Sequence, residues 1–346
     1  MTDHSTPEGS QALRASLGVT SVPTPLDELG RRRFLFVTGK GGVGKTTLCA
    51  ALALALAARG KRVLVAMCNT KERLSAMLGV GPIEEQVVEV ARNVHAVNIS
   101  PDVALADYGA LILKVKALTT AVFDNKVTRT FFRATPGLYE WAMLGKAWWH
   151  TTEVHERGGH RYDVVLLDAP ATGHGLDMLR VPKVILEVVP PGILRRDAEK
   201  AWEMFADPTR SGVLAVTLPE ELPVTETVEL VTAIRGELGL PVLQLFVNAV
   251  VEPLFQEGQA AALLQDPGLL EPGAPAAAST PEAAAIVAGA RRAHKERVQT
   301  ESVRRLLGAV PVPATLLPHL FDEASTPAGT RRLAAHLAAA LVSGRA

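Results

Sequence analysis

The sequence has little of what marks several classes of protein. Its 346 residues include only two cysteines, Cys49 and Cys68, too few for a disulfide framework or for a four-cysteine zinc site within one chain. Lys and Arg together number 36, as do Asp and Glu, so no net charge draws the chain to nucleic acid or to an acidic membrane. No run of about 18 uncharged apolar residues occurs. We therefore expect no nucleic-acid partner and no integral membrane segment.

The bulk composition is typical of a globular protein. Hydrophobic residues make up 48% of the chain and charged residues 21%, which fits one large α/β domain or a core with an inserted lobe. Residues 1–30 are polar, with Ser, Thr, Pro and Gly and no signal peptide, and we interpret them as a mobile N-terminal arm ahead of a domain at 31–346. The scarcity of cysteine suits a reducing compartment, so we expect a cytoplasmic protein.

The most specific feature is a loop rich in glycine and lysine. Residues 34–37 form a short apolar run that predicts a buried strand, and the Ala/Leu-rich residues 46–58 predict a helix. Positions 39–46 between them read Gly-Lys-Gly-Gly-Val-Gly-Lys-Thr. A strand, a glycine loop and a helix in this order are the context that a phosphate-binding loop requires. An ordinary glycine-rich turn is the alternative, and the full match disfavours it.

The residue types of the loop suit a nucleotide with its metal. Glycines let the backbone curl so that its N–H groups point at an anion, and the helix N-terminus adds positive partial charge. Lys45 would reach the β/γ-phosphates of ATP, and the Thr46 hydroxyl would bind Mg²⁺. We expect the nucleotide to contact Gly39, Lys40, Gly41, Gly42, Val43, Gly44, Lys45, Thr46 and Thr47.

A second lysine, Lys40, lies in the first half of the loop. In this respect the loop resembles that of the deviant Walker A ATPases, where this lysine reaches across a dimer interface to the partner's nucleotide. The resemblance implies a homodimer with two nucleotides between its subunits. A solvated charge without a role is the alternative interpretation of Lys40.

Further apolar runs predict the fold. Buried strands are expected at 63–67, 164–167, 213–217, 242–247 and 310–313. Helical patterns separate them, so we predict an α/β fold: a doubly wound, mostly parallel sheet with its ligand at the carboxyl ends of the strands. Residues 102–157 and 178–210 break the alternation, and we interpret them as an α-helical lobe. A charged helix is expected at 282–307 after a low-complexity loop at 271–281.

Three of the tryptophans fall close together in the predicted lobe. Trp148 and Trp149 follow Trp141 by seven and eight residues, which places the three side chains near one helical face. They form either the core of the lobe or an apolar docking surface for a partner. We favour the core, because tryptophan usually packs.

A second motif follows the predicted strand at 164–167. Residues 168–174 read Asp-Ala-Pro-Ala-Thr-Gly-His, and an Asp that ends a buried strand beside a phosphate loop predicts a partner of Mg²⁺, here Asp168. The stretch 168–182 is similar to the Asp-Thr-Ala-Pro-Thr-Gly-His segment of the arsenite-pump ATPase family, which also contains the ATPases that deliver tail-anchored membrane proteins. Similar spacing recurs at 136–140, 216–220 and 247–248. The resemblance covers about residues 34–255, and it implies that Asn248 holds the adenine.

The departures from that family concern hydrolysis and metalloids. In the family, an Asp after the second strand orients the attacking water, and an ungapped alignment places Asn69 there. Because an amide cannot accept a proton as a carboxylate does, we expect tight ATP binding with slow or lost hydrolysis, with Glu72 as a possible substitute base. Lys40, Asn69 and Asp168 are thus the expected catalytic residues. The two cysteines cannot form an arsenite site; Cys49 is expected in the core, and Cys68 could be reactive.

Three functions remain open from the sequence. The first is a dimeric ATPase whose nucleotide state gates the binding of an unidentified protein client. The second is a non-catalytic regulatory subunit that pairs with an active paralogue. The third is a positioning ATPase of the septum or chromosome-partition type; against it, the Ala-rich tail with leucines at 333, 337 and 341 predicts a helix docked on the domain and not a membrane anchor. The basic cluster at 291–305 is either a partner surface or a solvated helix face.

Overall fold

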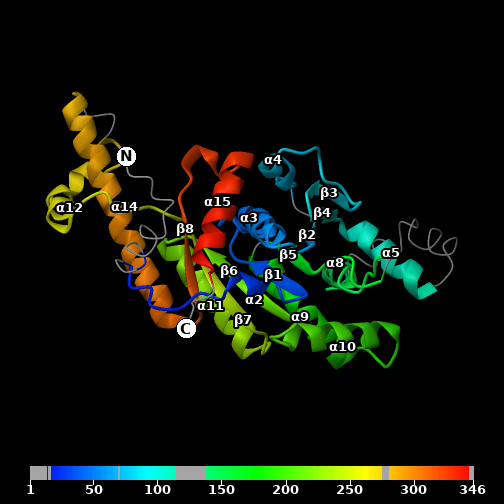
Figure 1. Ribbon diagram of the computed structural model, residues 1–346. Helices are drawn as coiled ribbons and strands as arrows, with labels where there is room; N and C mark the ends of the chain where they lie inside the picture. Colours follow the sequence, from blue (N-terminus) through cyan, green and yellow to red (C-terminus); the bar gives the residue numbers. More distant parts are fainter. Residues whose placement is uncertain are drawn as a thin grey trace.

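An eight-stranded sheet lies at the centre of the computed structural model, which describes residues 14, 17–68, 71–113, 137–156, 158–170, 172–274 and 280–342 (Figure 1). The strands are β1 Phe34–Thr38, β2 Val63–Cys68, β3 Val88–Ala91, β4 Val94–Ile99, β5 Val164–Asp168, β6 Ser211–Thr217, β7 Val242–Val250 and β8 Ala314–Pro318. Their order across the sheet is β3-β4-β2-β5-β1-β6-β7-β8. All neighbours pair in parallel except β3 and β4, which are antiparallel. The predicted fold class is confirmed.

Helices cover both faces of the sheet. They are α2 Leu26–Leu29, α3 Lys45–Ala58, α4 Leu74–Leu78, α5 Pro101–Leu113, α8 Leu138–Trp149, α9 Thr172–Val188, α10 Ile193–Ala206, α11 Glu221–Gly236, α12 Glu257–Leu263, α14 Pro281–Ala309 and α15 Pro327–Ala340, with 3₁₀ turns η1 Pro267–Leu270 and η2 Phe321–Glu323. Residues of β1 alternate between the two cores: Leu35 and Val37 pack with α3, whereas Phe34 and Phe36 pack with α8–α10. This period-two alternation is what a strand buried on both faces requires.

Helix α3 begins in the glycine loop and lies between the sheet and α15. It is apolar all round, because both of its sides are covered, and Leu48, Leu52 and Leu56 are buried. Leu333, Leu337 and Leu341 are buried in the same layer. The predicted docking of the C-terminal helix on the domain is confirmed. Within the described ranges, no helix is long and apolar enough to cross a membrane.

One predicted strand is wrong, and two observed strands were not predicted. The run 310–313 is not a strand; β8 begins at Ala314, because Pro311 and Pro313 have no N–H to donate to the ladder. The carbonyl of Pro313 still accepts a hydrogen bond from the Leu245 N–H, so the run joins the sheet edge only at its end. Strands β3 and β4 were not predicted. Polar side chains at His95 and Asn98 interrupt the apolar run of β4.

The N-terminal arm is only partly as interpreted. Leu17, Leu26 and Leu29 are buried, and the Thr24 N–H donates to the Gln244 Oε1 at 2.8 Å. Residues 17–30 therefore pack on the domain. Their apolar side chains are too widely spaced to give a periodic pattern, so the sequence alone predicted a free arm. Residues 1–13 lie outside the described part of the chain.

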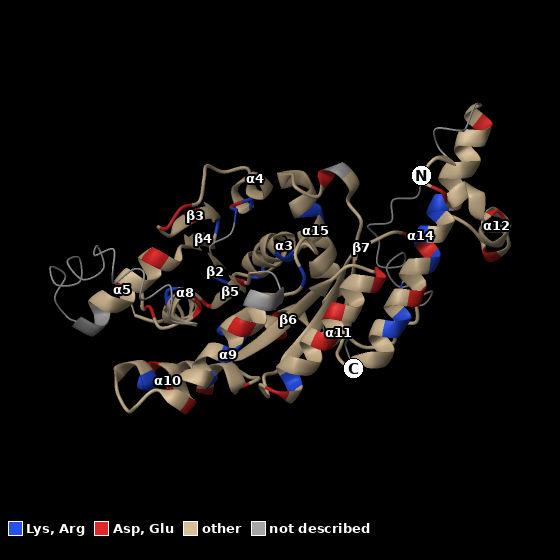
Figure 2. Ribbon diagram, turned by 180° about the vertical axis from the view of Figure 1, so that it is seen from behind, with Lys and Arg blue, Asp and Glu red and all other residues tan. Residues whose placement is uncertain are grey.

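The predicted helical stretches are largely helical where they are described. Helices α5 and α8 fall within 102–157, but 150–156 is a turn and loop region, and 114–136 lies outside the described residues. Helices α9 and α10 are separated at 189–192, as the prolines predict, and α14 confirms the charged helix. Figure 2 shows Lys and Arg interleaved with Asp and Glu along α14, and Arg292 pairs with Glu296 at 2.6 Å. This favours a solvated face over a basic partner surface.

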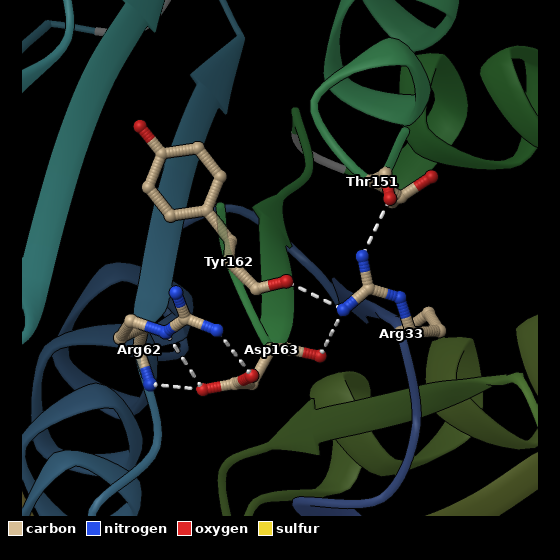
Figure 3. A network of polar contacts seen from close by, with 5 residues as sticks. All are labelled: Arg33, Arg62, Thr151, Tyr162 and Asp163. Atoms are coloured by element: carbon tan, nitrogen blue, oxygen red, sulfur yellow. Dashed lines mark hydrogen bonds and ion pairs between the residues drawn. The ribbon is translucent and has the colours of Figure 1, made fainter. Parts of the chain in front are cut away.

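Two arginines connect the amino ends of the central strands by hydrogen bonds (Figure 3). This end of the sheet is opposite the glycine loop, which follows the carboxyl end of β1. Arg33, before β1, donates to the carbonyls of Tyr162, Asp163 and Thr151. Arg62, before β2, donates its backbone N–H and its guanidinium to the Asp163 carboxylate at 2.8 and 3.0 Å. Burial alone would raise the pKa of Asp163, but the Arg62 hydrogen bonds and charge lower it below its usual value.

We expect Asp163→Asn to destabilise the fold by up to about 1 kcal/mol, because the partly exposed Arg62 loses its charged acceptor. Since the folded-state pKa is depressed, this contribution is present above the unfolded pKa of about 3.9 and is lost as the pH falls through the lower folded value. Urea unfolding at pH 7 and pH 3 measures it. An equal loss at both pH values would contradict the assignment.

Candidate functional site

The glycine loop, Asp168 and Asn248 meet at the carboxyl edge of the sheet. Strand β1 leads into the loop, and its neighbour β5 ends at Asp168 in register with Val37. On the other side, β6 separates β1 from β7, which carries Asn248. The strand order thus brings residues from three distant parts of the chain to one place. This is the edge at which open parallel sheets bind ligands.

Two glycines of the loop have no room for a side chain. Gly39 has φ of 152°, and a Cβ there would lie 2.2 Å from the Val216 carbonyl oxygen. Gly44 has φ of 98°, and a Cβ would lie 2.2 Å from the Asn248 Nδ2. The loop therefore keeps its curled path through close contact with β6 and β7, and only glycine allows that approach.

Gly39→Ala is expected to destabilise the protein by at least about 2 kcal/mol, because the methyl group meets backbone that cannot move without disturbing β6. Chemical denaturation monitored by circular dichroism measures the loss. Gly236→Ala on α11 is the matched control, since a Cβ there meets nothing within 4 Å. Equal unfolding midpoints for the two variants would contradict this account of the loop.

Lys45 is folded into its own loop. Its Nζ donates to the carbonyls of Lys40 at 2.9 Å and Gly39 at 3.1 Å. Burial lowers the pKa of Lys45, while the nearby Asp168 charge raises it. A partly buried ammonium held only by backbone carbonyls lacks a full counter-charge, so an anion entering the loop would be a better partner.

Thr46 and Asp168 form the second polar pair of the site. The Thr46 Oγ1 donates to the Asp168 Oδ2 at 2.5 Å, and Asp168 is 1% exposed. Burial raises the pKa of Asp168 to about 6, opposed by the Thr46 hydrogen bond and the Lys45 charge. A buried carboxylate beside a hydroxyl is a set of hard oxygen donors, and these residues therefore fit Mg²⁺.

Asn248 lies on the face of β7 that is turned toward the loop. Phe246 packs on the α3 side of the sheet, and Asn248, two residues on, lies on the same face. The register with β8 shifts between Val247 and Val250, where Ala249 has φ of 56°. The Asn248 Nδ2 donates to the Val43 carbonyl at 2.9 Å. In this structure its amide supports the loop, and the adenine contact stays a prediction.

Lys40 has a partner that was not predicted. Its Nζ lies 2.7 Å from the Glu226 Oε1 on α11, and both side chains are about one-third exposed. Nothing in the sequence linked these positions, which are separated by 186 residues and meet only because α11 packs beside β6. In this structure Lys40 is thus engaged within its own chain.

Other predicted residues are placed differently. Glu72 accepts hydrogen bonds from the Ser75 N–H and hydroxyl at 2.7 and 2.6 Å, so in this structure it caps the start of α4, and its role as a substitute base stays a prediction. Cys49 is in the core, as predicted. The prediction that Cys68 is reactive is wrong, because it is 1% exposed and burial raises its pKa. Asn69 and Thr70 lie outside the described residues.

Comparison with known proteins agrees with this geometry. A model of the anion-transporting ATPase family matches residues 32–190. The chain is 29% identical to the ATPase BagA of Mycobacterium tuberculosis over 240 residues, covering 67% of this chain and 69% of that protein. It is 28% identical to a putative arsenical pump-driving ATPase of Halobacterium salinarum, covering 60% and 34% of the two chains. It is 25% identical to the ATPase GET3 of Kluyveromyces lactis, covering 65% and 74%. Over residues 32–190 the chain is therefore similar to the anion-transporting ATPases, in agreement with the family that its phosphate loop and Asp168 segment predict.

Proposed function

We propose that this ATPase-family chain binds Mg-ATP in the loop at 39–47 and works as a dimer whose nucleotide state gates the binding of a protein partner. The observation that carries the proposal is the convergence of Lys45, Thr46 and Asp168 at the end of the glycine loop, beside β1 and β5. The family relationship supports nucleotide binding. The Mg²⁺, the dimer and the partner are inferences from the residues.

Each residue of the loop has a distinct task in this proposal. Lys45 would exchange its carbonyl partners for the β/γ-phosphates. Thr46 and Asp168 would hold Mg²⁺, Thr46 directly and Asp168 from the outer shell; when bound, the ion neutralises charge on the phosphates. The backbone N–H groups of Gly42 and Gly44 would cradle the phosphates. Asn248, whose amide donates to the Val43 carbonyl, would meet the base.

Hydrolysis is proposed to be slow. The carboxyl end of β2 lies beside that of β5, with Met67 in register with Asp168, and we propose that the residue after β2 acts on the attacking water. Asn69 takes that place in the sequence, and Glu72 is committed to capping α4. Within the described part of the chain, two carboxylates lie beside the loop and both are paired: Asp168 with Thr46 and Glu226 with Lys40.

A non-catalytic subunit that pairs with an active paralogue is the second candidate. The amide at Asn69 favours it, and the test is whether turnover appears when the chain is mixed with such a paralogue. A positioning ATPase with a membrane-anchoring tail is less well supported, because α15 buries its leucines against α3.

Two buried free thiols fit a reducing compartment, and we propose a cytoplasmic location.

The dimer is tested by measuring particle mass with and without Mg-ATP. Light scattering after gel filtration is expected to show two chains per particle with ATP. Lys40→Ala should still bind ATP but remain a single chain. In Glu226→Gln the competing ion pair is weakened, and because an exposed pair contributes up to about 1 kcal/mol, the ATP concentration needed for dimerisation should fall by up to about fivefold. Wild type and Lys40→Ala with the same mass in ATP would contradict the role of Lys40.

A further inference from the structure

Helices α5, α8 and α10 enclose a pocket of about 240 Å³ away from the glycine loop. Its walls include three of the four tryptophans of the chain, Trp141, Trp148 and Trp149, together with Tyr108. Trp141 is 1% exposed and stands edge-on to Tyr108, with ring centroids 6.3 Å apart at 86°. The tryptophan cluster is therefore partly core, as favoured from the sequence, and partly the wall of an opening, since Trp149 is 46% exposed.

Polar groups in these walls are left without partners. Neither the Trp141 Nε1 nor the Tyr108 Oη has a hydrogen-bond partner in the part of the chain that the structure describes. Buried donors without partners are costly and uncommon in folded proteins. Burial, with a contribution from the Asp197 carboxylate, raises the pKa of Tyr108 to about 12, so the phenol remains protonated. Trp141, Tyr108 and Asp197 thus gather at one wall of the pocket, where the two donors are poorly paired and the carboxylate lies beside them.

The charges at the pocket leave one carboxylate in excess. Lys146 pairs with Asp107 at 2.5 Å, so these two lining residues neutralise each other. Asp197, from α10, is also a lining residue and its side chain is 15% exposed. Within the described part of the chain it pairs with the exposed Arg196 at 3.9 Å, the outer limit of such a contact. A mostly buried carboxylate with so weak a counter-charge favours the entry of a cation.

Aromatic faces beside a carboxylate are the chemistry that recognises organic cations. Ring faces attract ammonium groups, and quaternary ammonium ligands are held in this way by clusters of tryptophan and tyrosine. The volume is below the roughly 300–1,000 Å³ of drug-sized sites, so a head group fits better than an extended molecule. We propose that the α5–α8–α10 pocket binds a small quaternary ammonium head group, held by its tryptophans and by Asp197. This inference does not depend on the proposed nucleotide function.

The test uses the full chain and its own tryptophans as the reporter. Choline is titrated into the protein while intrinsic fluorescence is followed, and 3,3-dimethyl-1-butanol serves as the neutral probe of the same shape. Choline is expected to bind saturably and at least tenfold more tightly than the alcohol. Equal responses to the two probes, or no saturable response to choline, would overturn the proposal.

Variants separate the carboxylate from the shape of the pocket. Asp197→Asn keeps the volume and is expected to weaken choline binding at least tenfold while leaving the alcohol unchanged. Gly145→Val places a side chain against the Trp141 ring, which a Cβ at that position already approaches at 3.6 Å, and should block the pocket. Trp202→Phe on α10 is the control, because Trp202 is not a lining residue. Choline binding that survives Asp197→Asn unchanged would contradict the proposal, whatever the behaviour of Gly145→Val.

The head group could belong to a free solute or to a lipid. Co-sedimentation with phosphatidylcholine vesicles, with phosphatidylglycerol vesicles as the control, distinguishes the two sources. Sedimentation lost in Asp197→Asn would assign a lipid head group. Binding of free choline that is lost in Asp197→Asn, without sedimentation, would assign a solute. Binding to both kinds of vesicle regardless of Asp197 would overturn the role of this pocket.

Discussion

Replacing Lys45 with alanine is expected to weaken ATP binding by about 100-fold or more, the equivalent of about 2.7 kcal/mol for charge-assisted hydrogen bonds to phosphate. The Lys45 ammonium is partly buried, and its hydrogen-bond acceptors among the described residues are the carbonyls of Gly39 and Lys40. Isothermal titration with Mg-ATP measures the change.

Lys295→Ala is the control for this experiment, because Lys295 is an exposed lysine on α14, remote from the loop. It should bind ATP as the wild type does. If Lys45→Ala and the wild type bound ATP equally well, the phosphate loop would not be the nucleotide site. Unfolding curves for the variants check that the lost binding is not a lost fold.

The second large effect is expected at the position that follows β2. Asn69→Asp should raise ATP turnover by about 10²–10⁴-fold, the range that a positioned general base contributes. ATP affinity should change little, because the substitution lies outside the loop at 39–47 in the sequence. Steady-state release of phosphate measures the rate.

Asn69→Ala provides the matched comparison, since it removes the amide without adding a carboxylate. It should show no gain. Wild-type turnover already at the level of Asn69→Asp would contradict slow hydrolysis. It would also remove the main reason for the alternative of a non-catalytic subunit.

Local signals in the sequence predicted the centre of the site. The loop at 39–46, the strand before it and the helix after it are contiguous, and β5 places Asp168 at their side through an apolar run that ends in a carboxylate. Each of these depends on neighbours in the chain, so periodicity and turn chemistry were enough. The docking of α15 could be predicted for the same reason, from leucines at helical spacing.

Features that depend on distant contacts could not be predicted. Glu226 meets Lys40 only because α11 returns beside β6, and Glu72 is withdrawn from the site by a contact with Ser75. Strand β4 carries polar residues that weaken its apolar pattern, and the run 310–313 resembles a strand until its prolines are considered. In these places, packing and the loss of backbone donors decided the structure.

The central claim is that ATP occupies the loop at 39–47, between Asp168 and Asn248. Hydrogen–deuterium exchange of the full-length chain, with and without Mg-ATP, tests it most directly, because protection of backbone N–H groups reports which segments a ligand orders. The account predicts slower exchange in peptides that contain residues 39–47 and 248, and no such change in Lys45→Ala. Identical exchange of those peptides with and without saturating Mg-ATP would contradict it.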